Sequence, residues 1–199
     1  MSKWHFLTIT KKGTKMIAFI VLLGIFVILG FYYIFTHNSL VRLKNRTLEA
    51  WYDIDVQLKR RYDLIPNLVN VVKGYTTHEK DVFEKVTQAR ANAIQVGDHK
   101  VVASTEKDVT EALKSLFAVV ENYPQLKADQ NFTDLQEELT DTENKLESAR
   151  RYYNGCVRDY NIKQEVFPAN IIAGIYSFAK ETYFELDNDE EKKAPEVKF

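Results

Sequence analysis

Apolar side chains recur at alternating spacings of four and three residues through most of the second two thirds of the chain. Sustained alternation of apolar and polar residues, which is typical of strands, is absent. Rows with the 4-3 spacing bury against neighbouring helices. The pattern therefore predicts an all-α fold, an antiparallel bundle of three to four long helices. The two longest rows are Leu68, Val72, Tyr75, Glu79, Val82, Val86, Ala89, Ala93 and Val96, and Phe132, Leu135, Leu139, Thr142, Leu146, Ala149, Tyr153, Cys156 and Tyr160.

Each of these long rows has one polar member, Glu79 in the first and Thr142 in the second. A polar residue at such a position usually costs stability and sets the register between helices. The alternative is that the side chain lines a small polar site inside the bundle. Glu79 and Thr142 are therefore the candidates for a buried polar site.

Two shorter rows and a few breaks complete the helical pattern. An apolar row stays in phase on both sides of Pro66, which favours a kinked helix over a hairpin. This row is Leu58, Tyr62, Ile65, Val69 and Val72. Gly97-Asp98-His99 is expected to end one helix, and Thr105 with Asp108 resembles a capping box that opens the next. Thr133 with Gln136 is a second candidate cap. The shorter rows are Leu48, Trp51, Ile54, Leu58, Tyr62 and Ile65, and Val109, Leu113, Leu116, Val120 and Tyr123.

The N-terminal part of the chain has a different character, because Met16 to Phe35 is a run of twenty residues without a charge. As a helix it would be about 30 Å long, the thickness of the hydrocarbon core of a bilayer. A cleaved signal peptide usually has a shorter apolar region and a small-residue cleavage site, which Thr36-His37-Asn38-Ser39 does not supply. We therefore expect an uncleaved transmembrane anchor over residues 16–36, with membrane lipid as its partner.

The charge of the chain changes sign along its length. Residues 1–48 hold seven Lys and Arg and no acidic residue, whereas residues 49–199 hold 20 basic and 28 acidic residues. Four lysines precede the apolar run and three basic residues follow it closely. Counting Lys and Arg thus favours a cytoplasmic N-terminus and an extracytoplasmic bundle by one charge. We therefore expect a single-pass membrane protein, and the side of the bundle stays open.

The C-terminal region combines an apolar patch with a charged tail. We expect the patch to pack on the end of the bundle; the alternative is contact with the membrane surface. The predicted domains are a basic flank (1–15), the anchor (16–36), the helical bundle (37–186) and a disordered tail (187–199). The patch residues are Ile171, Ile172, Ile175, Tyr176 and Phe178.

Motifs that would indicate catalysis or a cofactor are missing from the sequence. HExxH, GxxxxGK[ST], GxGxxG and GxSxG do not occur, so no catalytic, cofactor-binding or metal-ligating residue is predicted. The lone Cys156 lies in a 4-3 row, which favours an inert core thiol over a nucleophile.

Carboxylates such as Glu147 have arginines one turn away, as on a solvated helix face. The basic triplet at 59–61 is flanked by aspartates in an acidic body, which argues against nucleic acid as a partner.

Several long segments resemble the LemA family of bacterial membrane proteins. They are NRTLEAWYDIDVQLKRRYDLIPNLVNVVKGY, EALKSLFAVVENYPQLKADQNFTDLQEELTDTENKLESARRYYN, VRDYN and FPANIIAG, and the resemblance covers roughly residues 38–199. It implies an N-terminal transmembrane helix, an antiparallel helical bundle, and a location in the inner membrane of a bacterial cell. It implies no mechanism, since that family has no agreed molecular function or catalytic residues. Family descriptions commonly place the short N-terminus outside the cell, opposite to the charge count.

Three classes of function remain for such a protein. The first is a scaffold or adaptor that presents a helical surface to a protein partner at the cell envelope, and it is the one we expect. The second is a protein that senses or binds lipid through the patch at 171–178. The third, an enzyme, is the least expected because the sequence offers no nucleophile, metal set or cofactor loop.

Overall fold

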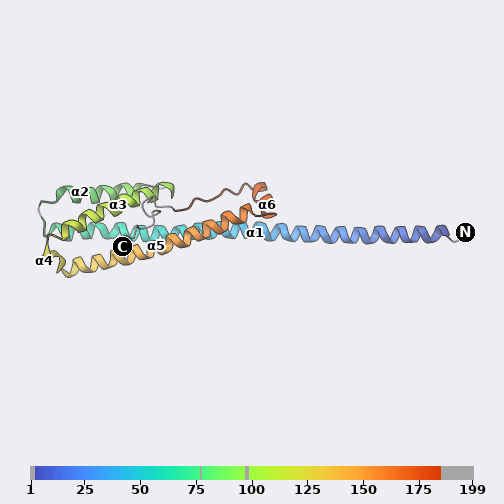
Figure 1. The fold of residues 1–199 in the computed structure, drawn as a ribbon, viewed down its shortest axis with the longest axis horizontal. Coiled ribbons are helices and arrows are strands. Elements are labelled where there is room, and N and C mark those ends of the chain that lie inside the picture. Colours follow the sequence, from blue (N-terminus) through green and yellow to red (C-terminus); the bar gives the residue numbers. More distant parts are fainter. Residues whose placement is uncertain (1–2, 77, 97–98, 185–199) are drawn as a thin grey trace, which may run out of the picture. The chain divides into compact units, whose positions relative to one another are not determined.

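The computed structural model describes residues 3–76, 78–96 and 99–184, and it describes side chains from residue 16 onward, except at 99 and 100. All regular structure in this part is helical, which confirms the all-α prediction (Figure 1). The predicted tail at 187–199 and the side chains of the basic flank at 1–15 lie outside the described residues. The helices are α1 (Lys3–Lys73), α2 (Lys80–Gln95), α3 (His99–Val120), α4 (Pro124–Lys127), α5 (Gln130–Glu165) and α6 (Ala169–Ile175).

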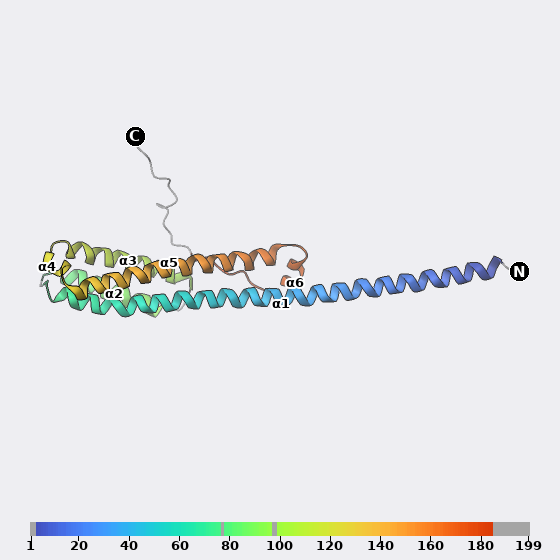
Figure 2. The same cartoon turned by 90° about the horizontal axis from the view of Figure 1, so that it is seen from below.

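The chain divides into two compact units, and α1 and α5 contribute to both. The first unit consists of Met1–Asn45 and Asp159–Lys180, and the second of Arg46–Arg158 and Glu181–Phe199. The second unit holds α2, α3, α4 and the larger part of α5. The four long helices α1, α2, α3 and α5 match the expected number for the bundle (Figure 2).

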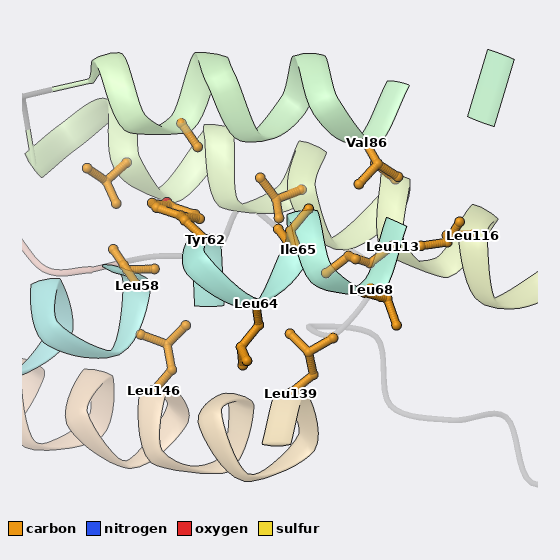
Figure 3. Close-up of a cluster of buried hydrophobic side chains, with 14 of the residues drawn as sticks. Leu58, Tyr62, Leu64, Ile65, Leu68, Val86, Leu113, Leu116, Leu139 and Leu146 are labelled. Atoms are coloured by element: carbon orange, nitrogen blue, oxygen red, sulfur yellow. The ribbon is translucent and has the colours of Figure 1, made fainter. Parts of the chain in front are cut away.

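In the second unit α1 is the central helix, because it buries side chains on two sides. Figure 3 shows α1 between α2 and α3 on one side and α5 on the other. Leu64 points toward Leu139 and Leu146 of α5, whereas Val86 of α2 and Leu113 of α3 lie on the opposite side. These side chains belong to one continuous apolar core, so burial of the 4-3 rows holds the bundle together.

Pro66 lies inside α1, which continues to Lys73. The prediction of a helix in place of a hairpin at Pro66 is therefore confirmed.

The first long row was wrong in one respect, because it joined two helices into one. The structure ends α1 at Lys73 and begins α2 at Lys80. The Gly74 N–H still closes the last turn by donating to the Val71 carbonyl at 3.1 Å. Glycine then favours leaving the helix. Tyr75, a member of the row, is exposed, and its hydroxyl donates to Asp129 Oδ2 at 2.8 Å. The spacing continued by coincidence across a loop.

Both predicted threonine caps were also wrong, since the helices begin earlier. Thr105 lies inside α3, where its hydroxyl donates to the Val102 carbonyl at 3.0 Å. Thr133 likewise lies inside α5, and the cap of that helix is Asp129, whose Oδ1 accepts the Phe132 N–H at 3.0 Å. A threonine can bond a carbonyl of its own helix as readily as it caps one, so the motif was ambiguous.

In the first unit, the residues up to Asn45 carry the apolar run. The part of α1 with described side chains, Met16–Lys73, contains an 18-residue window with a mean hydropathy of 2.7, and none of that window is buried. By length and composition it is the one helix in the described part of the chain that could cross a membrane.

Candidate functional site

A charge centre is buried between α1, α3 and α5. Glu106 of α3, whose side chain is only 1% exposed, accepts a hydrogen bond at 2.7 Å from Arg61 Nη1 of α1. Arg150 Nη2 of α5 lies 3.5 Å from the same carboxylate oxygen. The Tyr62 hydroxyl donates to the other oxygen at 2.5 Å. One carboxylate thus binds three partners from two other helices.

Glu143 completes the charge centre at its outer edge. Its carboxylate lies 3.2 Å from Arg61 Nη2 and 3.9 Å from Arg150 Nη1, and 45% of its side chain is exposed. Two arginines therefore face two glutamates, so the formal charges of the charge centre balance. Arg61 Nη2 also donates to the Thr110 hydroxyl at 3.0 Å.

The environment shifts the protonation of two members of the charge centre. Burial, and then the negative charge of Glu106, raise the pKa of Tyr62 far above its usual range, so the phenol stays a hydrogen-bond donor. Burial lowers the pKa of Arg150, and the nearby Glu106 and Glu143 oppose that shift. An arginine keeps its proton under any physiological condition, so the Arg150 guanidinium remains charged.

An open pocket of about 270 Å³ adjoins the charge centre. Leu113, Phe117 and Leu139 line its apolar part, and Arg61 and Glu143 contribute polar atoms. Arg61 is already committed to Glu106, Glu143 and Thr110. Within the described residues, no three His, Cys, Asp or Glu side chains form a group that could hold a metal ion. This arrangement is suited to holding three helices in one register.

The prediction from sequence missed this charge centre, although a signal existed. Val102, Glu106 and Val109 extend the 4-3 row of α3 toward its N-terminus, and Glu106 interrupts that row as Glu79 interrupts another. The sequence also paired Glu147 with both arginines that follow it. Arg151 does bind Glu147 at 2.7 Å, but Arg150 turns inward to Glu106.

The structure places the two predicted polar residues in different settings. Thr142 is fully buried, and its hydroxyl donates to the Glu138 carbonyl at 2.7 Å, within the same helix. Glu79 is half-buried and precedes the first residue of α2, where its side chain makes no capping hydrogen bond. The described residues show no hydrogen bond or ion pair between Glu79 and Thr142.

The predicted apolar patch at 171–178 divides between buried and exposed residues of the first unit. Ile172 is buried with Leu40 and Tyr160, and Phe178 packs beside them. Ile171, Ile175 and Tyr176 are exposed. The buried part of the patch thus packs within the first unit, on Leu40 and Tyr160.

A second exposed apolar feature lies on α1 within the bundle. Leu48, Tyr52 and Val56 are 45%, 57% and 62% exposed, respectively. Because they are four residues apart, they follow one face of the helix. We call these three residues the α1 stripe. Leu48 had been expected in the core, and the structure places it outside.

The segment 181–184 is bound to α5 through hydrogen bonds between α5 side chains and its backbone. Asn154 Nδ2 donates to the Phe184 carbonyl at 3.0 Å, and Asn154 Oδ1 accepts the Phe184 N–H at 2.8 Å. The Tyr153 hydroxyl donates to the Thr182 carbonyl at 2.9 Å. Trp51 packs on both the Tyr153 and Phe184 rings, so this segment is a part of the core.

The two buried tyrosines predict a loss of stability at alkaline pH. Burial raises the pKa of Tyr153 from 10.0 to about 12, and Tyr62 shifts in the same direction. The folded state then holds protons that the unfolded state loses, so the stability is fully present below about pH 10 and falls as the pH rises through about 12. Urea unfolding at a series of pH values measures the slope. Tyr153→Phe should make that slope shallower; an identical slope in both proteins contradicts the assignment.

The sequence of this chain matches a protein family and several known proteins. The family model described as LemA family matches residues 50–199, three quarters of the chain and nearly all of the bundle. The chain is 26% identical over 164 residues to Protein LemA of Metamycoplasma hominis, a match that covers 82% of this chain and 74% of that protein.

Two further relatives carry a different name. The chain is 22% identical over 175 residues to Magnetosome protein MamQ 2 and to Magnetosome protein MamQ 1 of Paramagnetospirillum magneticum. These matches cover 75% of this chain and 64% of each relative. The chain therefore spans just under two thirds of the length of these magnetosome proteins.

Proposed function

This chain belongs to the LemA family. We propose that it is a single-pass anchored helical bundle that acts as a scaffold at a bacterial membrane. In this proposal, Met16 to Phe35 cross the membrane and the bundle presents a helical surface to a protein partner. The bundle carries out no reaction of its own.

The α1 stripe is the observation that carries this proposal. Three large apolar side chains exposed on one face are an expected feature of a protein-binding surface. Tyr52, at the centre of the stripe, is of a residue type that often dominates binding energy. Asp55 and Lys59 lie beside it as a charged rim. A partner with an apolar helix face and charges at its edges would complement this surface.

The buried side chains beneath the α1 stripe support the proposal that α1 presents the stripe in a fixed position. Trp51, Ile54 and Leu58 belong to the same turns of α1 and are buried. The charge centre is expected to prevent α1 from sliding along α3 and α5, since any shift would leave Glu106 or an arginine buried without its partner. A surface that is already ordered binds without a further entropic cost of ordering.

Photocrosslinking in native membranes tests the proposal. Benzoylphenylalanine at position 52 should give one discrete product with a different protein. Val56→Asp in the same chain should abolish that product, because it places a charge in the proposed contact. Position 53 is the matched control, since it is also exposed but lies about 100° further around the helix.

Three results would contradict the proposal. Equal crosslinking from positions 52 and 53 would mean that the stripe does not direct binding. A product at twice the mass of the chain would identify a second copy as the occupant. Failure to crosslink any protein from position 52, with the chain present in the membrane, would remove the partner altogether.

A further inference from the structure

In the first unit, α6 packs against the turns of α1 where the apolar run ends. Tyr33 belongs to that run, and its hydroxyl forms a hydrogen bond with the hydroxyl of Tyr176. The His37 ring lies 4.4 Å from the Tyr176 ring and 6.0 Å from the Phe178 ring, measured between centroids. Segments more than 140 residues apart in sequence thus build one aromatic cluster around the end of the proposed membrane span.

A small core fixes how far α6 lies along α1. Ile172 and Ala173 are buried together with Leu40 and Tyr160. Ile172 therefore lies near Leu40, whereas Tyr176 lies beside Tyr33, seven residues or about 10 Å closer to the span. Figures 1 and 2 both show α6 alongside α1. The short helix thus occupies the level at which the span would leave the bilayer.

The opposite side of α6 and the turn before it expose a row of large apolar side chains. Phe167 is 80% exposed, Ile171 55% and Ile175 64%. Ile171 and Ile175 are four apart and follow one face of α6, and Phe167 lies in the turn that precedes the helix. Such a row is unfavourable in water, but it is what an interfacial helix inserts between lipid headgroups and acyl chains. Tyrosine, as at positions 33 and 176, also favours that layer.

We propose that Phe167, Ile171 and Ile175 insert into the interfacial layer of the membrane that α1 spans. The occupant of this face is phospholipid, because α6 is continuous with the end of the span through Tyr33 and Tyr176. The inference rests on the proposed anchor. A second contact beside the span would restrict the tilt of α1, and it would do so without any charged recognition of a headgroup.

Spin labels in the full chain, reconstituted in phosphatidylcholine vesicles with some phosphatidylglycerol, test this inference. Cys156 is buried, and Cys156→Ala provides a background for single cysteines. Labels are placed at 171 and 175, with 26 as the bilayer reference and the exposed position 147 as the water reference. Labels at 171 and 175 should be accessible to oxygen and protected from a water-soluble nickel complex, at a depth of about 5–10 Å.

The reference positions separate failure of this inference from failure of the anchor. If 171 and 175 report water like position 147 while 26 reports lipid, the anchor stands and the interfacial contact is refuted. If position 26 itself reports water, the anchor is refuted and the inference falls with it.

A substitution gives an independent reading. Ile171→Asp should make the label at 175 accessible to the nickel complex, while the protein still floats with the vesicles through α1. Asn170→Asp is the matched control, because Asn170 is also exposed on α6 but lies outside the apolar row. Protection at 175 that survives Ile171→Asp would overturn the proposal.

Discussion

Replacing Glu106 by glutamine is expected to lower the free energy of unfolding of the bundle by about 3–5 kcal/mol. The carboxylate is 1% exposed and pairs with two guanidiniums that are themselves 6% and 10% exposed. A glutamine fills the same volume but removes the charge, so one buried arginine loses its compensation. Its amide also brings N–H groups toward Arg61 and Arg150, which have only donors to offer. Urea unfolding of the full chain in detergent, followed by circular dichroism, measures the change.

Glu147→Gln is the matched control for that substitution. Glu147 pairs with Arg151 at 2.7 Å, but both side chains are largely exposed. An exposed pair one turn apart contributes roughly 0.3–0.5 kcal/mol, so the control should stay close to the wild type. Equal effects of the two substitutions would show that the charge centre contributes no more than a surface ion pair. The role assigned to it in holding the register of α1, α3 and α5 would then be wrong.

Replacing Phe26 and Ile28 together by lysine is expected to release the protein from membranes. The apolar run holds fourteen Leu, Ile, Phe and Val residues, which together favour insertion by roughly 4–8 kcal/mol. Each lysine near the centre of a span costs about 2.5–3.5 kcal/mol, and the two apolar contributions are lost as well. The two effects nearly cancel, so most of the protein should move from the membrane pellet to the soluble or aggregated fraction after expression.

Phe26→Leu with Ile28→Leu controls for the disturbance of two neighbouring sites, and this variant should stay in the membrane fraction. The bundle of the lysine variant should retain its helical circular dichroism, because the apolar window of α1 is not buried against other helices. Full membrane association of the lysine variant, resistant to alkaline carbonate, would contradict the proposed anchor.

The helical class and the long apolar helix at the N-terminus could be predicted because both depend on local properties. The 3.6-residue period of an amphipathic helix can be recognised within about ten residues. The hydropathy of Met16 to Phe35 can likewise be recognised from that segment alone. For the same reason, the path of α1 through Pro66 followed from the phase of the residues on either side. Periodicity failed where a loop happened to preserve it, as it did between Val72 and Val82, since spacing carries no information about backbone bonds.

The fate of individual polar and exposed residues was decided only by the tertiary structure. Glu106 meets Arg61 and Arg150 across separations of 45 and 44 residues, and Tyr33 meets Tyr176 across 143. Any face of an isolated helix could be the buried one, and the packing of neighbouring helices determines which face is buried. That packing buried Arg150 instead of Glu79, turned Leu48 outward, and placed Tyr176 beside Tyr33 at the end of the apolar run. The sequence therefore determined which segments are helices, and long-range packing determined which of their side chains are free to bind.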